Sequence, residues 1–162
     1  MLTLSIETSC DETSLAFMHK PESIPKYDNF LDEINSYKVL ASLISSQIKL
    51  HQPYGGVVPE IGARAHAEQI HMLMEELLEQ VWQKNPDLDL IKNTSLDSKI
   101  DFLKNLDYIF VTTNPGLPPA LKVGVEFAKT LSYFVAQKHN KIIPVVPINH
   151  LHGHLVSCFY QN

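Results

Sequence analysis

Residues 2–19 read LTLSIE-TSCDET-SLAFMH, and their pattern predicts the start of a sheet. The first six residues, 2–7, alternate apolar and polar side chains, which is the period of a half-buried strand. A polar cluster at 8–13 separates them from a second apolar stretch at 14–19. Two short strands joined by a polar loop predict a β-hairpin.

A third strand and two irregular segments are predicted next along the chain. Residues 21–36 are polar, hold two prolines and lack a helical period, so we expect an insertion or a long turn. Residues 37–48 resume an extended apolar pattern and predict a third strand, antiparallel to the second. Residues 51–59, with Pro53, Gly55, Gly56 and Pro59, predict a loop.

A long helix is predicted from about Glu60 to the proline at position 86. Its apolar positions recur near the 3.6-residue period. Residues 87–104 are charged and polar, and predict a connector with weak structure.

The last third of the chain predicts two more strands and a second helix. Residues 106–113 form a buried-type strand, and Pro118 opens a helix, because proline is tolerated in a first turn. Gly124 and Ala128 lie one turn apart on that helix and offer a small-residue face for close packing. Residues 142–146 predict a fifth strand, and a final helix starts near residue 149.

This order, β-β-β-α-β-α-β followed by a helix start, predicts an α/β fold. Three antiparallel strands and two right-handed crossovers give one mixed five-stranded sheet with flanking helices. We detect no internal repeat, so residues 1–162 are expected to form a single domain.

Composition excludes several classes of protein. The chain has 162 residues, is 44% hydrophobic and 19% charged, and carries a net charge of −5, so it is not a disordered polymer. It has no apolar run long enough to span a bilayer, and no positive segment of a secretory signal at its start. Two cysteines are too few for a disulfide framework. This favours a reducing compartment, most simply the cytoplasm. The acidic balance argues against autonomous nucleic-acid binding.

The sequence His150-Leu151-His152-Gly153-His154 is a candidate metal site. Residues four apart share one helix face, so His150 and His154 could bind one ion. The alternative is three surface histidines near a helix start. A zinc-protease helix reads H-E-x-x-H, and Leu151 occupies the position of its general base. Two histidines are an incomplete ligand set, so a third ligand must come from elsewhere.

Three polar or glycine-containing segments are candidate substrate loops. In the first turn, Thr8 and Ser9 could contact phosphate, and Asp11 or Glu12 could act as a base; a plain polar turn is equally consistent. The other two are Gly55-Gly56 and Pro115-Gly116. The second of these follows a strand and precedes a helix, where ligands often bind in α/β folds.

Four further residues have ordinary structural interpretations. Arg64 and His66, early in the long helix, are expected to be solvated. Cys10 and Cys158 are expected to be small buried hydrophobic residues.

Six blocks of sequence occur in the order found in one known family. Together they resemble the TsaD family, formerly called Gcp, of tRNA threonylcarbamoyladenosine transferases, over essentially the whole chain. The blocks are Ile6–Thr13; Ser45-Ser46-Gln47 with His51; Tyr54–Glu60; Arg64-x-His66; Pro115-Gly116-Leu117 with Val123-Gly124 and Ala128-Lys129; and Asn149-His150-Leu151-x-Gly153-His154.

The resemblance implies a fold and a reaction. The chain would be the N-terminal lobe of a two-lobed actin/Hsp70-like (RNase H-like) protein, with the C-terminal lobe absent. Family members transfer threonylcarbamoyl from threonylcarbamoyl-adenylate to the N6 amine of the adenosine beside the anticodon in tRNA. Bacterial members work with a TsaB-like paralogue and a TsaE-like ATPase.

It also implies roles for single residues. One divalent metal ion, iron or zinc, would be bound by His150 and His154, and the third protein ligand, an aspartate of the second lobe, is missing from this chain. Asp11 and Glu12 match the acidic pair of the family's cleft, with Asp11 the candidate for proton removal.

Departures from the family pattern leave two other functions open. Asn114 replaces a usual glycine, and residues 21–36 and 87–104 look like insertions. Without the second lobe, the fragment is not expected to turn over alone. One alternative is a non-catalytic, TsaB-like dimerising scaffold, although such paralogues lack the histidine pair. The other is a metalloprotease, which Leu151 argues against.

Overall fold

The computed structural model describes residues 1–21, 29–92 and 99–160. Its centre is a five-stranded sheet with the order β3-β2-β1-β4-β5. The first three strands are antiparallel, and β4 and β5 run parallel to β1. The strands are β1 (Leu2–Glu7), β2 (Glu12–His19), β3 (Lys38–Ser46), β4 (Tyr108–Asn114) and β5 (Val145–Asn149).

The mixed sheet confirms the fold class expected from the sequence. A hairpin extended by a third antiparallel strand is followed by two helical crossovers, one from β3 to β4 and one from β4 to β5.

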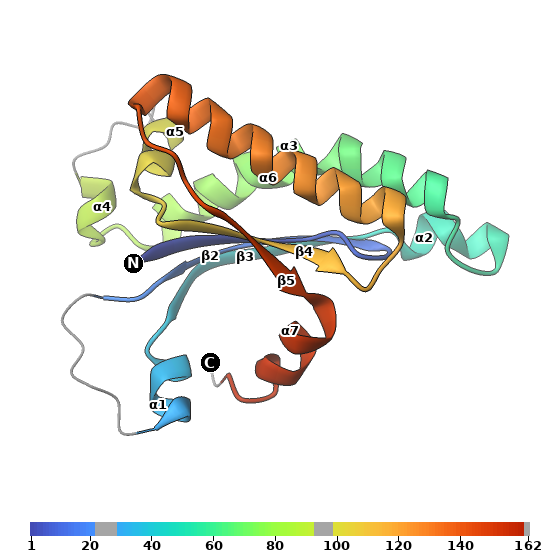
Figure 1. Ribbon diagram of the computed structural model, residues 1–162, viewed down its shortest axis with the longest axis horizontal. Helices are drawn as coiled ribbons and strands as arrows, with labels where there is room; N and C mark the ends of the chain where they lie inside the picture. Colours follow the sequence, from blue (N-terminus) through green and yellow to red (C-terminus); the bar gives the residue numbers. More distant parts are fainter. Residues whose placement is uncertain (22–28, 93–98, 161–162) are drawn as a thin grey trace.

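Two long helices, α3 (Pro59–Lys84) and α6 (Pro118–His139), cover the same face of the sheet (Figure 1). The core lies between them and the strands. Leu4 of β1 and Leu77 of α3 are both fully buried in this one cluster. Gly124 and Ala128 of α6 are buried as well, so the expected small-residue face is confirmed.

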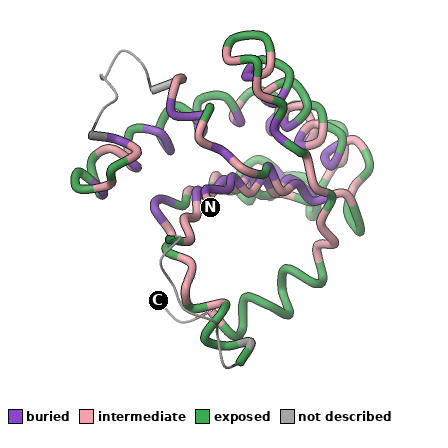
Figure 2. Tube along the Cα trace, turned by 60° about the vertical axis from the view of Figure 1, so that its left-hand side comes forward, coloured by how far each residue is buried: buried purple, intermediate pink, exposed green. Residues whose placement is uncertain are grey.

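The other face of the sheet, called the open face below, is sparsely covered. Two short helices, α1 (Phe30–Asn35) and α7 (His150–Ser157), lie on this side (Figure 1). No residue of α7 is buried, and Figure 2 shows this side of the molecule as mostly exposed. No helix among the described residues has the length and apolarity needed to cross a membrane.

Two segments expected to be irregular contain helical turns. Within 21–36, α1 begins after Asn29, whose side chain accepts a hydrogen bond from Asp32 N; residues 22–28 lie outside the described part. The expected loop at 51–59 starts with the end of α2 (Ile48–His51) and a 3₁₀ turn, η1 (Gln52–Tyr54). Both are too short to show a helical period in sequence.

The connector at 87–104 is also more ordered than expected. It forms α4 (Asp89–Lys92), α5 (Lys99–Phe102) and the 3₁₀ turn η3 (Leu103–Asn105), with 93–98 outside the described residues. Phe102 is fully buried and packs edge-on against Phe17 of β2 and Trp82 of α3. The apolar residues of this segment therefore close one end of the core.

The fifth strand lies three residues further along than expected. It spans Val145–Asn149 rather than 142–146, because Val145 pairs with Ile109 in the β4 register. Pro147 lies within this strand. Proline is tolerated there because β5 is at the edge of the sheet.

Candidate functional site

The turn between β1 and β2 is held by hydrogen bonds to three consecutive backbone carbonyls. Leu117 N donates to Ser9 O at 2.7 Å, His66 Nε2 to Cys10 O at 3.0 Å, and Gln47 N to Asp11 O at 2.8 Å. These donors come from the start of α6, from α3 and from the start of α2. The turn is thus fixed from three sides, with Asp11 half-buried and Glu12 exposed at its end.

The loop that precedes α6 packs directly on this turn. A Cβ atom on Gly116 would lie 2.7 Å from Ser9 O, so only glycine permits the contact. The buried Thr8 donates its hydroxyl to Ala120 O at 2.9 Å, also in α6. The structure therefore brings together two of the three predicted substrate loops, Thr8-Ser9 and Pro115-Gly116.

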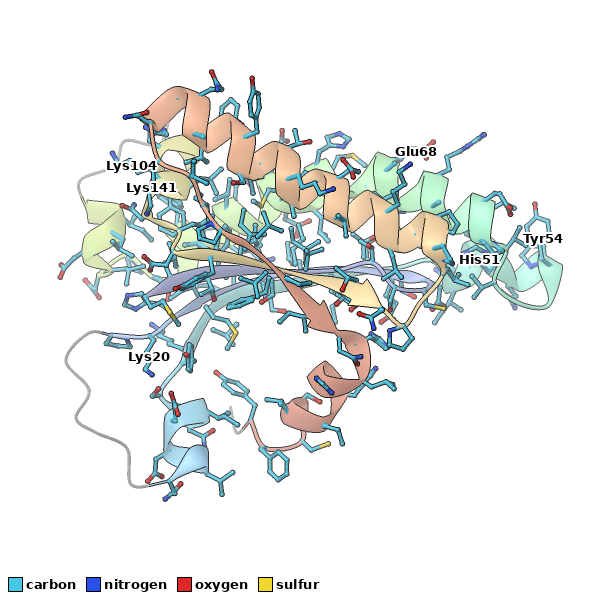
Figure 3. The ribbon with its side chains drawn as sticks, viewed as in Figure 1. Lys20, His51, Tyr54, Glu68, Lys104 and Lys141 are labelled. Carbon is cyan, nitrogen blue, oxygen red and sulfur yellow. The ribbon has the colours of Figure 1, made fainter. Side chains whose placement is uncertain are left out.

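The third predicted loop, Gly55-Gly56, lies further out. Gly55 has a φ of 71° and closes η1, and a Cβ on either glycine would meet open space. Figure 3 shows Tyr54, which precedes Gly55, beyond His51 at the outer end of this region. The buried His51 joins the region to the turn, because its Nε2 donates to Gln47 Oε1 at 3.1 Å.

His150 and His154 converge as the one-turn spacing predicts. Asn149 caps α7, accepting from Leu151 N at 2.9 Å, and starts the helix at the carboxyl end of β5. The two Nε2 atoms lie 3.0 Å apart. Metal–imidazole bonds are about 2.0–2.1 Å long, so one ion could bond to both atoms. The pair therefore fits a metal ion in distance and in donor chemistry.

A complete metal-binding cluster is not formed by these residues alone. In residues 1–21, 29–92 and 99–160, no group of three His, Cys, Asp or Glu side chains is placed to hold an ion. His150 and His154 would supply two ligands, and a third protein ligand would have to come from outside the described residues of this chain.

Glu7, at the end of β1, is a site residue that the sequence analysis did not single out. Its Oε2 lies 3.2 Å from His150 Nδ1, and Ser9 Oγ lies 3.2 Å from the same nitrogen. Burial alone would raise the pKa of Glu7, but hydrogen bonds from Ser9, Thr112 and His150 outweigh it and lower the pKa. The strand alternation that puts Leu4 and Ile6 in the core puts Glu7 on the open face.

Two structural expectations for nearby residues are wrong. His66 is fully buried rather than solvated, because its ring fills the space under the turn and Thr13 Oγ1 donates to its Nδ1 at 2.7 Å. Cys10 and Cys158 are exposed rather than buried, since one lies on the turn and the other just after α7. Although the residue as a whole is exposed, partial desolvation of its thiol and the adjacent Asp11 raise the pKa of Cys10, which opposes thiolate formation. Arg64 is exposed, as expected.

Asn114 raises no conformational difficulty in the position of the usual glycine. The non-glycine residue with positive φ in the described chain is Asn140, and Asn114 has a negative φ. Asparagine therefore fits here without the special freedom of glycine.

A groove of about 360 Å³ runs between α7 and the open face of the sheet. Glu7, His150 and His154 line it, together with sheet residues such as Phe110 and Ile148. The histidine pair is therefore accessible from a hollow at the carboxyl ends of β1, β4 and β5, where ligands bind in open α/β sheets.

These features define a class: an α/β protein with a mixed five-stranded sheet that presents a histidine pair beside a fixed polar turn. The family model for tRNA N6-adenosine threonylcarbamoyltransferase, TsaD, matches residues 38–96 and 90–162. The chain belongs to the TsaD family.

Curated relatives agree with this membership. The tRNA N6-adenosine threonylcarbamoyltransferase of Fusobacterium nucleatum is 39% identical over 100% of this chain and 36% of its own length. That of Dictyoglomus turgidum is 36% identical over 98% of this chain and 36% of its own. The chain thus spans about a third of the length of these relatives. Among solved structures, YeaZ from Pseudomonas aeruginosa aligns with a TM-score of 0.49 and 16% identity, covering 91% of this chain and 43% of that one.

Proposed function

We propose that this chain is the N-terminal lobe of a tRNA N6-adenosine threonylcarbamoyltransferase. The observation that carries the proposal is the convergence of His150 and His154, 3.0 Å apart at Nε2, beside the fixed turn of the β1–β2 hairpin. Family membership supports the reaction, and the groove along α7 supplies space for a substrate.

His150 and His154 hold one divalent metal ion, iron or zinc, with an aspartate from a second lobe as the third protein ligand. When bound, the ion acts as a Lewis acid and a template for threonylcarbamoyl-adenylate. The chain's own residues place the two imidazoles: the Asn149 cap sets the start of α7, and Glu7 and Ser9 contact the far nitrogen of His150.

The reaction is an acyl transfer. The N6 amine of the adenosine attacks the carbamoyl carbon of threonylcarbamoyl-adenylate, a C–N bond forms, and the bond from that carbon to the phosphate oxygen breaks, releasing AMP. The amine loses a proton, which Asp11 accepts, with Glu12 beside it. Pro115 and Gly116 are the proposed contacts to the adenylate, and Gly55 and Gly56 remain predicted contacts further out. Thr8 and Ser9 are buried and support this loop through Ala120 O and Leu117 N.

Transfer RNA would be bound by the assembled protein rather than by this lobe. The lobe carries a net charge of −5, and phosphate contacts dominate nucleic-acid affinity. The second lobe and TsaB-like and TsaE-like partners would supply positive surface, in the cytoplasm.

The two alternatives differ in what they require of the histidine pair. A non-catalytic TsaB-like scaffold would need neither His150 nor His154. A metalloprotease would need a general base next to the first histidine, where Leu151 stands with 56% of its surface exposed. The convergent pair therefore favours the transferase.

A reconstitution tests the proposal. The chain joined to a second lobe is incubated with metal, tRNA, threonylcarbamoyl-adenylate and the two partner proteins, and the tRNA nucleosides are measured by mass spectrometry. We expect N6-threonylcarbamoyladenosine with the native sequence and at least a hundredfold less with His150→Ala plus His154→Ala. Equal product from both would overturn the proposal.

A further inference from the structure

His150 is held on both of its ring nitrogens. Its Nδ1 lies 3.2 Å from Glu7 Oε2, and its Nε2 lies 3.0 Å from His154 Nε2. Ser9 Oγ also lies 3.2 Å from Nδ1, and no residue of α7 is buried. Glu7 and Ser9 are therefore the main contacts between the end of β1 and the side chain that begins α7.

A carboxylate can only accept a hydrogen bond, so its partner must carry the proton. Glu7 Oε1 already accepts from Ser9 N, which fixes the carboxylate at the end of β1. The facing Nδ1 of His150 then donates to Oε2. A neutral imidazole with its proton on Nδ1 has its lone pair on Nε2, the atom that faces His154.

We propose that Glu7 is a positioning residue that locks His150 in the Nδ1–H tautomer and aims the Nε2 lone pair at the metal site. This inference rests on the proposed function for the identity of the site. Glu7 acts through His150 and is not itself a ligand, because it contacts the nitrogen on the opposite side of the ring.

The arrangement has a consequence for His154. With His150 Nε2 an acceptor, the contact between the two Nε2 atoms requires His154 to donate from its own Nε2. Without metal, the two histidines are thus opposite tautomers. Binding an ion to both Nε2 atoms requires the proton of His154 to move to Nδ1, while His150 keeps its tautomer.

The tautomers are directly measurable by ¹⁵N NMR of the imidazole rings in this chain without metal. We expect a protonated Nδ1 on His150 and a protonated Nε2 on His154. Glu7→Leu should move His150 toward the Nε2–H form, and Glu7→Gln, which keeps an acceptor oxygen, should restore part of the native state. Glu68→Leu is the matched control. Glu68 is exposed on α3, and its substitution removes the same charge without touching the histidine pair (Figure 3).

A backbone amide spectrum shows whether each variant is folded. A His150 that is protonated at Nε2 in the native chain, or that keeps Nδ1–H in folded Glu7→Leu, would overturn the proposal.

Zinc affinity provides the second readout, measured by calorimetry on the same chains. Loss of a carboxylate that orients a metal-bound histidine costs about 10–100-fold in affinity, so we expect Glu7→Leu to weaken zinc binding by that factor and Glu68→Leu to leave it unchanged. Equal affinity in Glu7→Leu and the native chain would contradict the role of Glu7.

The two readouts separate the inference from the proposed function. If zinc binding is the same in His150→Ala plus His154→Ala as in the native chain, the metal site of the proposed function fails. The tautomer measurement, which uses no metal, still decides the role of Glu7.

Discussion

At the scale of single residues, buried side chains shape the turn that carries the candidate acids. His66 is fully buried and uses both ring nitrogens, donating to Cys10 O and accepting from Thr13. Burial lowers the pKa of His66, partly offset by the Cys10 carbonyl and nearby acidic charge. The folded protein therefore holds this imidazole neutral.

This burial predicts a pH dependence of stability. An unfolded histidine titrates near 6.5 and His66 titrates lower in the fold, so its contribution is complete above about pH 6.5 and is lost as pH falls through the folded pKa. We expect the free energy of unfolding, from urea denaturation, to fall from pH 7.5 to pH 5, and His66→Gln to flatten that decline. His71→Gln, exposed on the same helix, is the control; identical slopes for His66→Gln and the native chain would refute the account.

Two residues show what sequence could and could not predict at this scale. His66 lies four positions before Ile70, on the apolar stripe of α3, and that periodicity was a signal for burial. Glu7 follows the apolar–polar alternation of β1, and its place in that alternation indicates that its side chain lies on the open face of the sheet. Its contact with His150 joins residues 143 positions apart and depends on the β1–β4–β5 order, which no local pattern specifies.

At the scale of elements, α6 approaches β1 through a glycine. A Cβ on Gly124 would lie 2.5 Å from Thr8 Oγ1, whose hydroxyl is already bonded to Ala120 O. The small-residue face predicted from sequence therefore packs against the turn between β1 and β2, and α6 helps to position Ser9 and Asp11 in that turn.

Replacing that glycine should be destabilising. Alanine gains up to about 1 kcal/mol in helix propensity, but overpacking a tight contact costs typically about 1–3 kcal/mol, so we expect Gly124→Ala to lower the free energy of unfolding by about 1–2 kcal/mol. Gly153→Ala in α7, where a Cβ meets no atom within 4 Å, should not destabilise. Urea denaturation of both variants checks this; a Gly124→Ala chain as stable as the native one would show that the contact relaxes freely.

The elements were predictable to different degrees. The long helices and the first hairpin followed from strong periodicity. The connector at 87–104 was mistaken for weak structure because its buried residues, Ile91, Phe102 and Leu103, lie among charges in turns too short for a period. The start of β5 is set by pairing with Ile109, a tertiary contact.

At the scale of the whole molecule, the two sides of the sheet are unequal. The α3–α6 side holds the core, whereas α7 and the residues just after it expose apolar side chains, including Leu155 of α7 at 64% and Phe159 at 49%. Contiguous exposed apolar surface marks an interaction site. The proposed second lobe would cover this side and complete the cleft beside the histidine pair.

Hydrogen exchange can test this asymmetry. In the 162-residue chain, we expect amides of α7 to exchange rapidly and those of α3 and α6 slowly, because α7 has no buried residue. Joining a second lobe should slow exchange in α7 by at least tenfold and leave the centres of α3 and α6 unchanged. Protection confined to the α3–α6 side would show that the lobe docks elsewhere.

The central claim is that His150 and His154 hold a metal ion together. Equilibrium dialysis against zinc, followed by elemental analysis, measures the bound metal in the native chain, in His150→Ala plus His154→Ala, and in His152→Ala, which changes an exposed histidine of the same helix. We predict one zinc ion per native chain at saturation, its loss in the double variant and its retention in His152→Ala. Unchanged zinc in the double variant, or equal loss in His152→Ala, would contradict the account.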